Sequence, residues 1–123
     1  MAKPKFLIVG DLKIFCEGIE ALLQVLEYTD IETAENDEEA FQKLKAGAYN
    51  LVIVDEEISG VGGIDLVEEI KRFNITRVLL VIPDNEEKVN EVIASDNLCY
   101  IKKPATKADL KRVTDKIFKN KIF

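Results

Sequence analysis

The stretch that decides the fold is Leu51-Val52-Ile53-Val54-Asp55, an unbroken aliphatic run that ends in a carboxylate. Such a run, rich in β-branched residues, is typical of a strand buried on both faces, and these strands belong to parallel sheets covered by helices. Ligands and chemistry gather where parallel strands end, because the loops there carry free side chains. Asp55 is therefore a candidate functional residue, although an acid at this point can equally begin a loop or cap the next helix.

Apolar runs elsewhere in the chain predict four more strands, at residues 6–9, 31–34, 77–82 and 97–101. Each run is followed by residues whose apolar side chains recur at helical spacing. After the first run this spacing predicts a helix over residues 12–28, and its apolar face consists of Phe15, Ile19, Leu22, Leu23 and Leu26. The chain therefore alternates strands with amphipathic helices.

The next two predicted helices flank the central strand. Asn36 and Glu39 resemble a capping box that begins the first of them, and Gly47 is placed to end it. The second follows the Asp55 loop over residues 64–73, and its apolar face consists of Leu66, Val67, Ile70 and Phe73.

The last two predicted helices also begin at capping residues. Asp84 or Asn85 caps the first, whose inward face is predicted to be Val89, Val92 and Ile93. Thr106 and Asp109 form a capping-box pair at the start of the final helix.

Five strands, each followed by a helix through short connections, imply right-handed crossovers and a parallel sheet between helices. We predict an α/β fold: a doubly wound five-stranded parallel sheet of flavodoxin-like (βα)5 type, a three-layer sandwich with strand order 2-1-3-4-5.

The composition limits the classes of function. At 123 residues, with 47% hydrophobic side chains, the chain fits one domain over residues 1–123 with a core of its own. The net charge of −6 argues against binding to nucleic acid or to an anionic membrane, since both need clustered positive charge. The chain has no histidine, which excludes the usual zinc sites and any catalytic triad that needs imidazole.

The cysteines and the N-terminal residues suggest an intracellular setting. Cys16 and Cys99 are the only cysteines, and we interpret both as small buried apolar residues. The apolar run at residues 6–9 is far too short for a signal peptide or a membrane span. We therefore expect a soluble cytoplasmic protein.

Charged residues follow three of the predicted strands at the same end. If the strands run parallel, Asp11, Asp55 and Lys103 lie along one edge of the sheet, together with Ile82. Two carboxylates that face one another repel, and hard oxygen ligands suit Mg²⁺, so a divalent cation can sit between them while the ammonium holds an anion. Taken alone, Lys103 is also well explained as a solvated lysine, because Lys102 precedes it.

In their order and spacing these stretches resemble a bacterial response-regulator receiver domain of two-component signalling. The matching stretches are Phe6-Leu7-Ile8-Val9 followed by Asp11, the 51–55 strand with the loop ending at Gly63, and Tyr100-Ile101-Lys102-Lys103-Pro104. The resemblance covers almost the whole chain and implies a signalling protein rather than an enzyme.

The resemblance also implies roles for individual residues. Asp55 would accept a phosphoryl group from a partner histidine kinase or phosphotransfer protein, which supplies the histidine that this chain lacks. Mg²⁺ would be bound by the side chains of Asp11 and Asp55 and by the backbone carbonyl of Glu57. Lys103 would pair with the phosphoryl oxygens.

One departure from the family concerns the metal site. The family usually has two adjacent acids after the first strand, whereas this chain has Gly10-Asp11. We therefore expect weak Mg²⁺ binding, unless Glu56 or Glu57 reaches back toward the site. The simpler interpretation of both glutamates, which we favour, is solvated loop charge.

The other departure concerns the output of the signal. The family places a Ser or Thr hydroxyl at the end of the fourth strand, where this chain has Ile82, while the aromatic residue on the fifth strand is kept as Tyr100. Receivers commonly signal to a downstream domain or protein through the face made by the fourth helix, fifth strand and fifth helix. Here that face would include Lys88, Glu91 and Tyr100.

Three alternatives remain open from the sequence. The fold can serve as an atypical receiver, a protein-interaction module that works without phosphorylation, which the changes at Gly10 and Ile82 would explain. A phosphatase of the haloacid-dehalogenase type would use Asp55 directly, but it needs a second Asp where this chain has Glu57. A flavodoxin would need a phosphate-binding first loop, where Asp11 repels phosphate.

Overall fold

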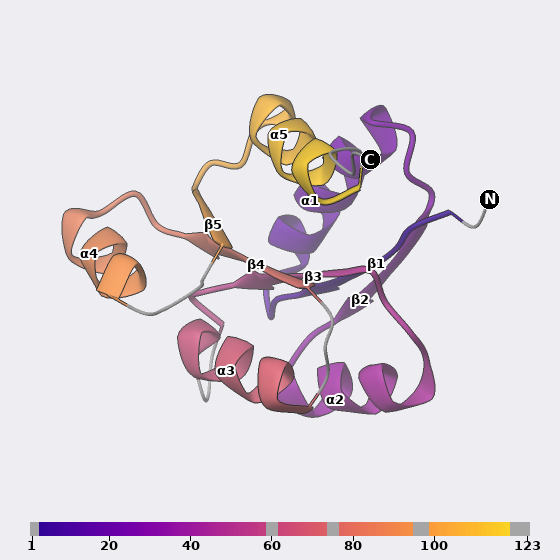
Figure 1. Cartoon of the computed structure of the whole chain (residues 1–123), viewed down its shortest axis with the longest axis horizontal. Coiled ribbons are helices and arrows are strands. Elements are labelled where there is room, and N and C mark those ends of the chain that lie inside the picture. Colours follow the sequence, from indigo (N-terminus) through magenta and orange to yellow (C-terminus); the bar gives the residue numbers. More distant parts are fainter. Residues whose placement is uncertain (1–2, 59–61, 74–76, 95–98, 119–123) are drawn as a thin grey trace.

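A parallel sheet forms the middle layer of the protein (Figure 1). The computed structural model describes residues 3–58, 62–73, 77–94 and 99–118. All neighbouring strands in this part of the chain pair in parallel, in the order β2-β1-β3-β4-β5. The strands are β1 (Lys5–Val9), β2 (Asp30–Ala34), β3 (Leu51–Asp55), β4 (Arg77–Ile82) and β5 (Cys99–Lys102). The predicted α/β fold and strand order are confirmed.

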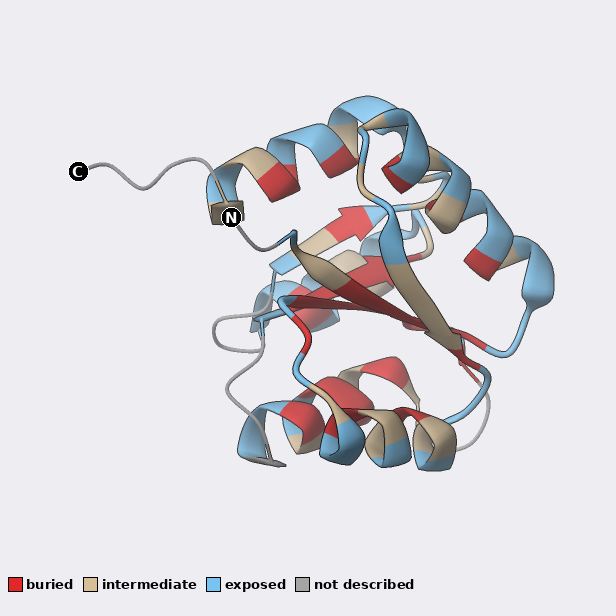
Figure 2. Cartoon of the chain, turned by 90° about the vertical axis from the view of Figure 1, so that its right-hand side faces the viewer, coloured by how far each residue is buried: buried red, intermediate tan, exposed pale blue. Residues whose placement is uncertain are grey.

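Helices cover both faces of the sheet. On one face lie α1 (Lys13–Val25) and α5 (Lys107–Phe118), and on the other lie α2 (Asp37–Ala46) and α3 (Gly63–Phe73), as Figure 1 shows. Side chains of β3 point alternately to the two helix layers. Leu51 and Ile53 pack with α1 and α5. Val52 and Val54 pack with α2 and α3. Figure 2 shows the result, a buried sheet between helices that are buried on one side and exposed on the other.

The strand order places Asp55 in the middle of one edge of the sheet. β3 lies between β1 and β4, and every residue of β3 is buried. Asp55 is the last residue of β3 and lies opposite Val81 of β4. The strand thereby carries a carboxylate from the core directly to the edge where the loops begin.

Among the described residues, α4 (Glu86–Ala94) has fewer buried side chains than the other helices, and Figure 1 shows it standing to their side. Val92 is its one buried residue, and Val89 is partly buried beside it. The prediction that Ile93 faces inward is wrong, because 64% of that residue is exposed. Ile93 follows Val92 directly and therefore points about 100° away around the helix axis.

The predicted helix starts are confirmed. Asn36 Oδ1 accepts a hydrogen bond of 2.8 Å from the Glu39 amide. Thr106 and Asp109 bond reciprocally, each side chain accepting from the other's backbone amide. At the start of α4, Asn85 rather than Asp84 is the cap, since Asn85 Oδ1 accepts from the amide of Lys88.

Some boundaries differ from the predicted ones. α1 ends at Val25 instead of residue 28, because the chain turns at Glu27, whose φ is 74°. The apolar pattern continues past the helix because Leu26 and Tyr28 still pack against the core from this turn. The predicted start of the last strand at residues 97–98, like the side chain of Phe73, lies outside the described residues.

Cys16 is buried as predicted, but Cys99 is exposed, so that prediction is wrong for Cys99. Cys99 opens the edge strand β5, where only Ile101 is fully covered. Within the described ranges, every helix is too short or too polar to cross a membrane.

Candidate functional site at the end of the central strand

Asp55 is completely buried, with no exposed side-chain surface. Its Oδ1 accepts a hydrogen bond of 3.0 Å from the backbone amide of Glu57. Its Oδ2 is buried and has no hydrogen-bond partner in the described part of the structure. A buried carboxylate oxygen without a donor is unfavourable, so this atom is expected to have a partner that the protein itself does not supply.

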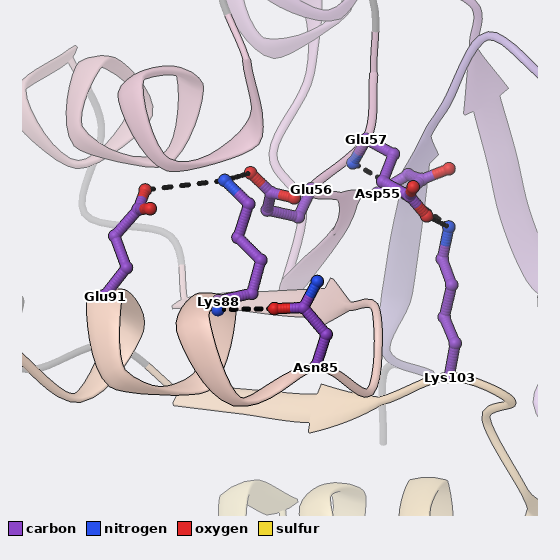
Figure 3. Close-up of polar contacts among 7 residues, drawn as sticks. All are labelled: Asp55, Glu56, Glu57, Asn85, Lys88, Glu91 and Lys103. Carbon is purple, nitrogen blue, oxygen red and sulfur yellow. Dashed lines mark hydrogen bonds and ion pairs between the residues drawn. The ribbon is translucent and has the colours of Figure 1, made fainter.

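Lys103 reaches Asp55 from the loop after β5 (Figure 3). Its amide donates a 2.8 Å hydrogen bond to the Ile82 carbonyl, which fixes the start of the loop against β4. Its Nζ lies 2.9 Å from Asp55 Oδ1 and 2.7 Å from Glu57 Oε1. The alternative that Lys103 is a solvated surface lysine is thus not what the structure shows.

The shared ion pair keeps Lys103 charged. Burial on its own would lower the pKa of Lys103, but the hydrogen bonds to Glu57 and Asp55 outweigh this effect, and the pKa is raised. The ammonium also lies 5.4 Å from the centre of the Phe15 ring. An ammonium whose pKa is raised therefore stands beside the Asp55 carboxylate.

Phe15 fills the space next to Gly10. A Cβ atom on Gly10 would lie 2.9 Å from Cδ2 of the Phe15 ring and 3.4 Å from Cβ of Asp55. The 2.9 Å contact is short enough that the ring would have to move, whereas 3.4 Å is an ordinary van der Waals distance. An aromatic ring that packs against the core thus occupies the space beside position 10.

The prediction that Glu56 is a solvated loop charge is wrong. Only 8% of its side chain is exposed, and its Oε2 lies 2.9 Å from Nζ of Lys88 in α4. Lys88 also contacts Glu91 at 3.5 Å, and its pKa is raised chiefly by its hydrogen bond to Glu56 (Figure 3). The residue after Asp55 is therefore tied to α4 by a largely buried ion pair.

Glu57 follows the less favoured of the two interpretations of the sequence, because its side chain reaches back toward the site. Its side chain is 53% exposed, yet it reaches back to Lys103 and shares that ammonium with Asp55. Nothing in the sequence separates the two glutamates, because which one turns inward depends on the path of the loop. In the structure, Glu56 pairs with Lys88 of α4, whereas Glu57 pairs with Lys103 beside Asp55.

Asp11 is exposed and follows β1 after Gly10. Its charge is felt at the nearby Cys16, whose pKa is raised to about 11, first by burial and then by the charges of Asp55 and other acids including Asp11. Among the described residues, no three acidic or cysteine side chains stand close enough together to hold a metal ion without movement.

Ile82 and Tyr100 lie on the α4 side of the edge. Ile82 is fully buried among aliphatic residues, and Tyr100 is half-buried against the same cluster. The register places Ile82 opposite Lys102 and Leu80 opposite Tyr100. The structure thus brings together Asp55, Lys103 and Glu57, and keeps Ile82 as a core residue beside them.

An apolar hollow of about 520 Å³ lies beside Lys103, between α1 and the loop that leads to α5. Two of its lining residues are unusually exposed for their type: Leu12 at 55% and Ile14 at 78%. The two exposed aliphatic side chains therefore lie at a hollow beside the charged site.

Comparisons with known proteins agree on one family. The family model described as the response regulator receiver domain matches residues 6–115. The chain is 31% identical over 120 residues to chemotaxis protein CheY-3 of Vibrio cholerae, covering 93% of this chain and 91% of that protein. It is 29% identical over 118 residues to chemotaxis protein CheY of Pseudomonas aeruginosa, with 93% and 95% covered.

The solved structures show the same fold. The crystal structure of a response regulator receiver domain protein from Clostridium thermocellum superimposes with a TM-score of 0.81 at 20% identity, and 94% of each chain is covered. At this identity the likeness concerns the fold alone.

Proposed function

Because the chain belongs to the response-regulator receiver domains, signalling proteins of two-component systems, we propose that Asp55 accepts a phosphoryl group from a histidine kinase or phosphotransfer partner. The observation that carries this proposal is the contact between Asp55 and Lys103, a buried carboxylate held 2.9 Å from an ammonium. A carboxylate is a weak nucleophile, so its reaction depends on position and on neutralising the charge of the phosphoryl oxygens.

The chemistry is a displacement at phosphorus. A carboxylate oxygen of Asp55 forms a new P–O bond as the P–N bond of the partner's phosphohistidine breaks. The electron pair stays on the imidazole nitrogen, which takes a proton from water. Lys103, already beside Oδ1 of Asp55, pairs with the phosphoryl oxygens as they arrive.

A divalent cation fits the chemistry of this site. The side chains of Asp11 and Asp55 and the backbone carbonyl of Glu57 are hard oxygen donors, and Oδ2 of Asp55 is a buried oxygen in need of a partner. When bound, Mg²⁺ supplies positive charge for the phosphoryl oxygens. This assignment follows the family and the donor set, and the binding of Mg²⁺ is part of the proposal.

The partner is proposed to dock over the apolar hollow. Leu12 and Ile14 are exposed on the same edge as Lys103, so a protein surface that covers them brings its phosphohistidine close to Asp55. Asp55 itself has no exposed surface. A donor therefore reaches it only after a side chain at the entrance, such as that of Glu57, has moved aside.

The signal is proposed to leave through α4 toward a downstream domain or protein. Ile82 offers no hydroxyl for a phosphoryl group to bond, so the usual connection through that position is absent at this residue. The ion pair between Glu56 and Lys88 is a second connection, since Glu56 adjoins Asp55 and Lys88 belongs to α4. Tyr100 lies against the same cluster and completes this face.

The deciding experiment is intact-mass spectrometry of wild type and Asp55→Asn after incubation with Mg²⁺ and acetyl phosphate. A single phosphoryl adduct in wild type alone supports the proposal, because the adduct forms only where a carboxylate takes the phosphoryl group as acetate leaves, and Asp55→Asn removes that carboxylate. Circular dichroism of both proteins confirms that the variant is folded. A folded wild type without an adduct would instead support a phosphorylation-independent interaction module.

A further inference from the structure

Position 10 of this chain supplies no third carboxylate to the proposed cation site. That position is glycine, and the ring of Phe15 occupies the space beside it. Asp11 and Asp55 are then the two acids that remain from the family pattern. Magnesium and calcium sites set their affinity by the number and charge of their ligands, so a further carboxylate would change the site markedly.

Glu57 is the acid best placed to fill this role. Its Oε1 and Oδ1 of Asp55 lie within 2.7 Å and 2.9 Å of the same Lys103 nitrogen, so the two carboxylates are neighbours (Figure 3). Its side chain is 53% exposed and can rotate without disturbing the core. Glu56, by contrast, is buried and held by Lys88.

The charge and hydrogen bonding of the pocket favour an added cation. One ammonium serves two carboxylates, which leaves an excess of negative charge at Asp55 and Glu57. Independently, Oδ2 of Asp55 is fully buried without a hydrogen-bond donor among the described residues. A divalent cation satisfies that oxygen and balances the charge.

We propose that the Glu57 side chain is a ligand of the divalent cation at Asp55, and that it exchanges its ion pair with Lys103 for the cation when the cation binds. The proposal rests on the proposed function, from which it takes the cation site, and it adds a ligand that the family pattern does not contain. Release from Glu57 leaves Lys103 available to the phosphoryl group. Departure of the Glu57 side chain from Lys103 also opens a path to the buried Asp55 carboxylate.

The test is calorimetric titration of the unphosphorylated protein with Mg²⁺, and with Mn²⁺ as a second probe. We expect Glu57→Gln to weaken binding at least about tenfold, as losses around metal ligands commonly do. The matched control is Glu56→Gln, which removes the same charge one residue away from a side chain that points to α4. We expect its affinity to stay within about twofold of wild type, because only a general charge effect would alter it.

A second readout concerns Lys103. In NMR spectra, Mg²⁺ should shift the side-chain resonances of Lys103 more in wild type than in Glu57→Gln at equal cation occupancy, because the variant lacks the Glu57 ion pair and keeps only the contact with Asp55. Equal Mg²⁺ affinity in wild type and Glu57→Gln would overturn the inference, as would equal weakening by Glu56→Gln and Glu57→Gln. Both results leave the phosphorylation of Asp55 to be decided separately by the mass measurement.

Discussion

The ring of Phe15 lies so close to Gly10 that a Cβ atom at position 10 would come within 2.9 Å of Cδ2 of the ring, so a larger residue there requires the ring to move. This explains why restoring an acid is not a simple reversion. We expect Gly10→Asp alone to lower the free energy of unfolding by about 1 kcal/mol, as overpacking commonly does. Urea unfolding measures this loss.

The matched comparison for this prediction is Gly10→Asp combined with Phe15→Leu. The smaller side chain makes room for the acid, so the double variant should recover stability relative to Gly10→Asp and bind Mg²⁺ more tightly than wild type. Gly10→Ala separates the two effects, since it adds the carbon without the charge. If Gly10→Ala is as stable as wild type, the Phe15 ring can move aside without loss of stability, which would contradict the prediction.

Lys103 compensates the buried charge of Asp55. Removing Lys103 should therefore destabilise the protein more than removing the charge of Asp55. Lys103→Met leaves Asp55 buried without its cation and should cost about 3 kcal/mol of unfolding free energy. Asp55→Asn should cost much less, because Lys103 keeps Glu57 as a partner. Chemical unfolding of both single variants and of the double variant gives the coupling, which is the interaction free energy between Lys103 and Asp55.

The sign of the pH dependence follows from the raised pKa of Lys103. A raised pKa means that the stabilisation is present wherever the unfolded lysine is still protonated and is lost only as the pH rises through the folded pKa. The coupling should therefore be constant around neutral pH and fall in strongly alkaline solution. A coupling that declines between weakly acidic and neutral pH would contradict this assignment.

Lys88 plays the corresponding role for Glu56. Lys88→Met should lower stability by about 2 kcal/mol, somewhat less than for a fully buried pair because Lys88 itself is partly exposed. Glu91→Gln removes only the exposed contact of the same lysine and should change stability by less than about 0.5 kcal/mol. Thermal unfolding followed by circular dichroism distinguishes the two.

Phosphorylation provides a further measurement on this pair. If α4 responds through Lys88, hydrogen exchange in residues 86–94 should change on phosphorylation in wild type and remain unchanged in Lys88→Met. Intact mass must show that the variant is still phosphorylated on Asp55. A response of α4 that survives in Lys88→Met would place the connection elsewhere.

The two cysteines should differ in reactivity. Cys99 is exposed, whereas Cys16 is buried, its thiol lies 3.5 Å from the Gly10 carbonyl, and its pKa is raised to about 11. Because the thiolate is the reactive form, one thiol per chain should react rapidly with Ellman's reagent at neutral pH. Cys99→Ser should abolish the rapid phase and Cys16→Ser should retain it.

The fold was predictable because local patterns and overall topology agree in this sequence. The aliphatic run at β3 has the composition of a strand buried on both faces, and capping residues such as Asn36 and Thr106 mark the helix starts directly. The predictions of burial that failed each concern one side chain. Ile93 and Cys99 are apolar residues on elements at the margin of the sheet, where periodicity alone does not say how much is covered.

The site was only partly predictable, for a different reason. Strand ends are fixed by the topology, so Asp55 and Lys103 could be expected at one edge. The directions of Glu56 and Glu57 depend on loop geometry, and the position of the Phe15 ring depends on the rotamer it adopts beside Gly10. None of these is encoded in a periodic pattern.

The attachment of α4 by Val92 and the Glu56–Lys88 pair has a consequence for how the protein responds to ionic strength. Dissolved ions screen exposed pairs such as Lys13–Glu17, but they reach a buried carboxylate poorly. Added salt should therefore loosen contacts on the outer surfaces of the helices while α4 stays in place. The position of the output helix would then follow the state of Asp55 and remain insensitive to changes in the salinity of the surrounding solution.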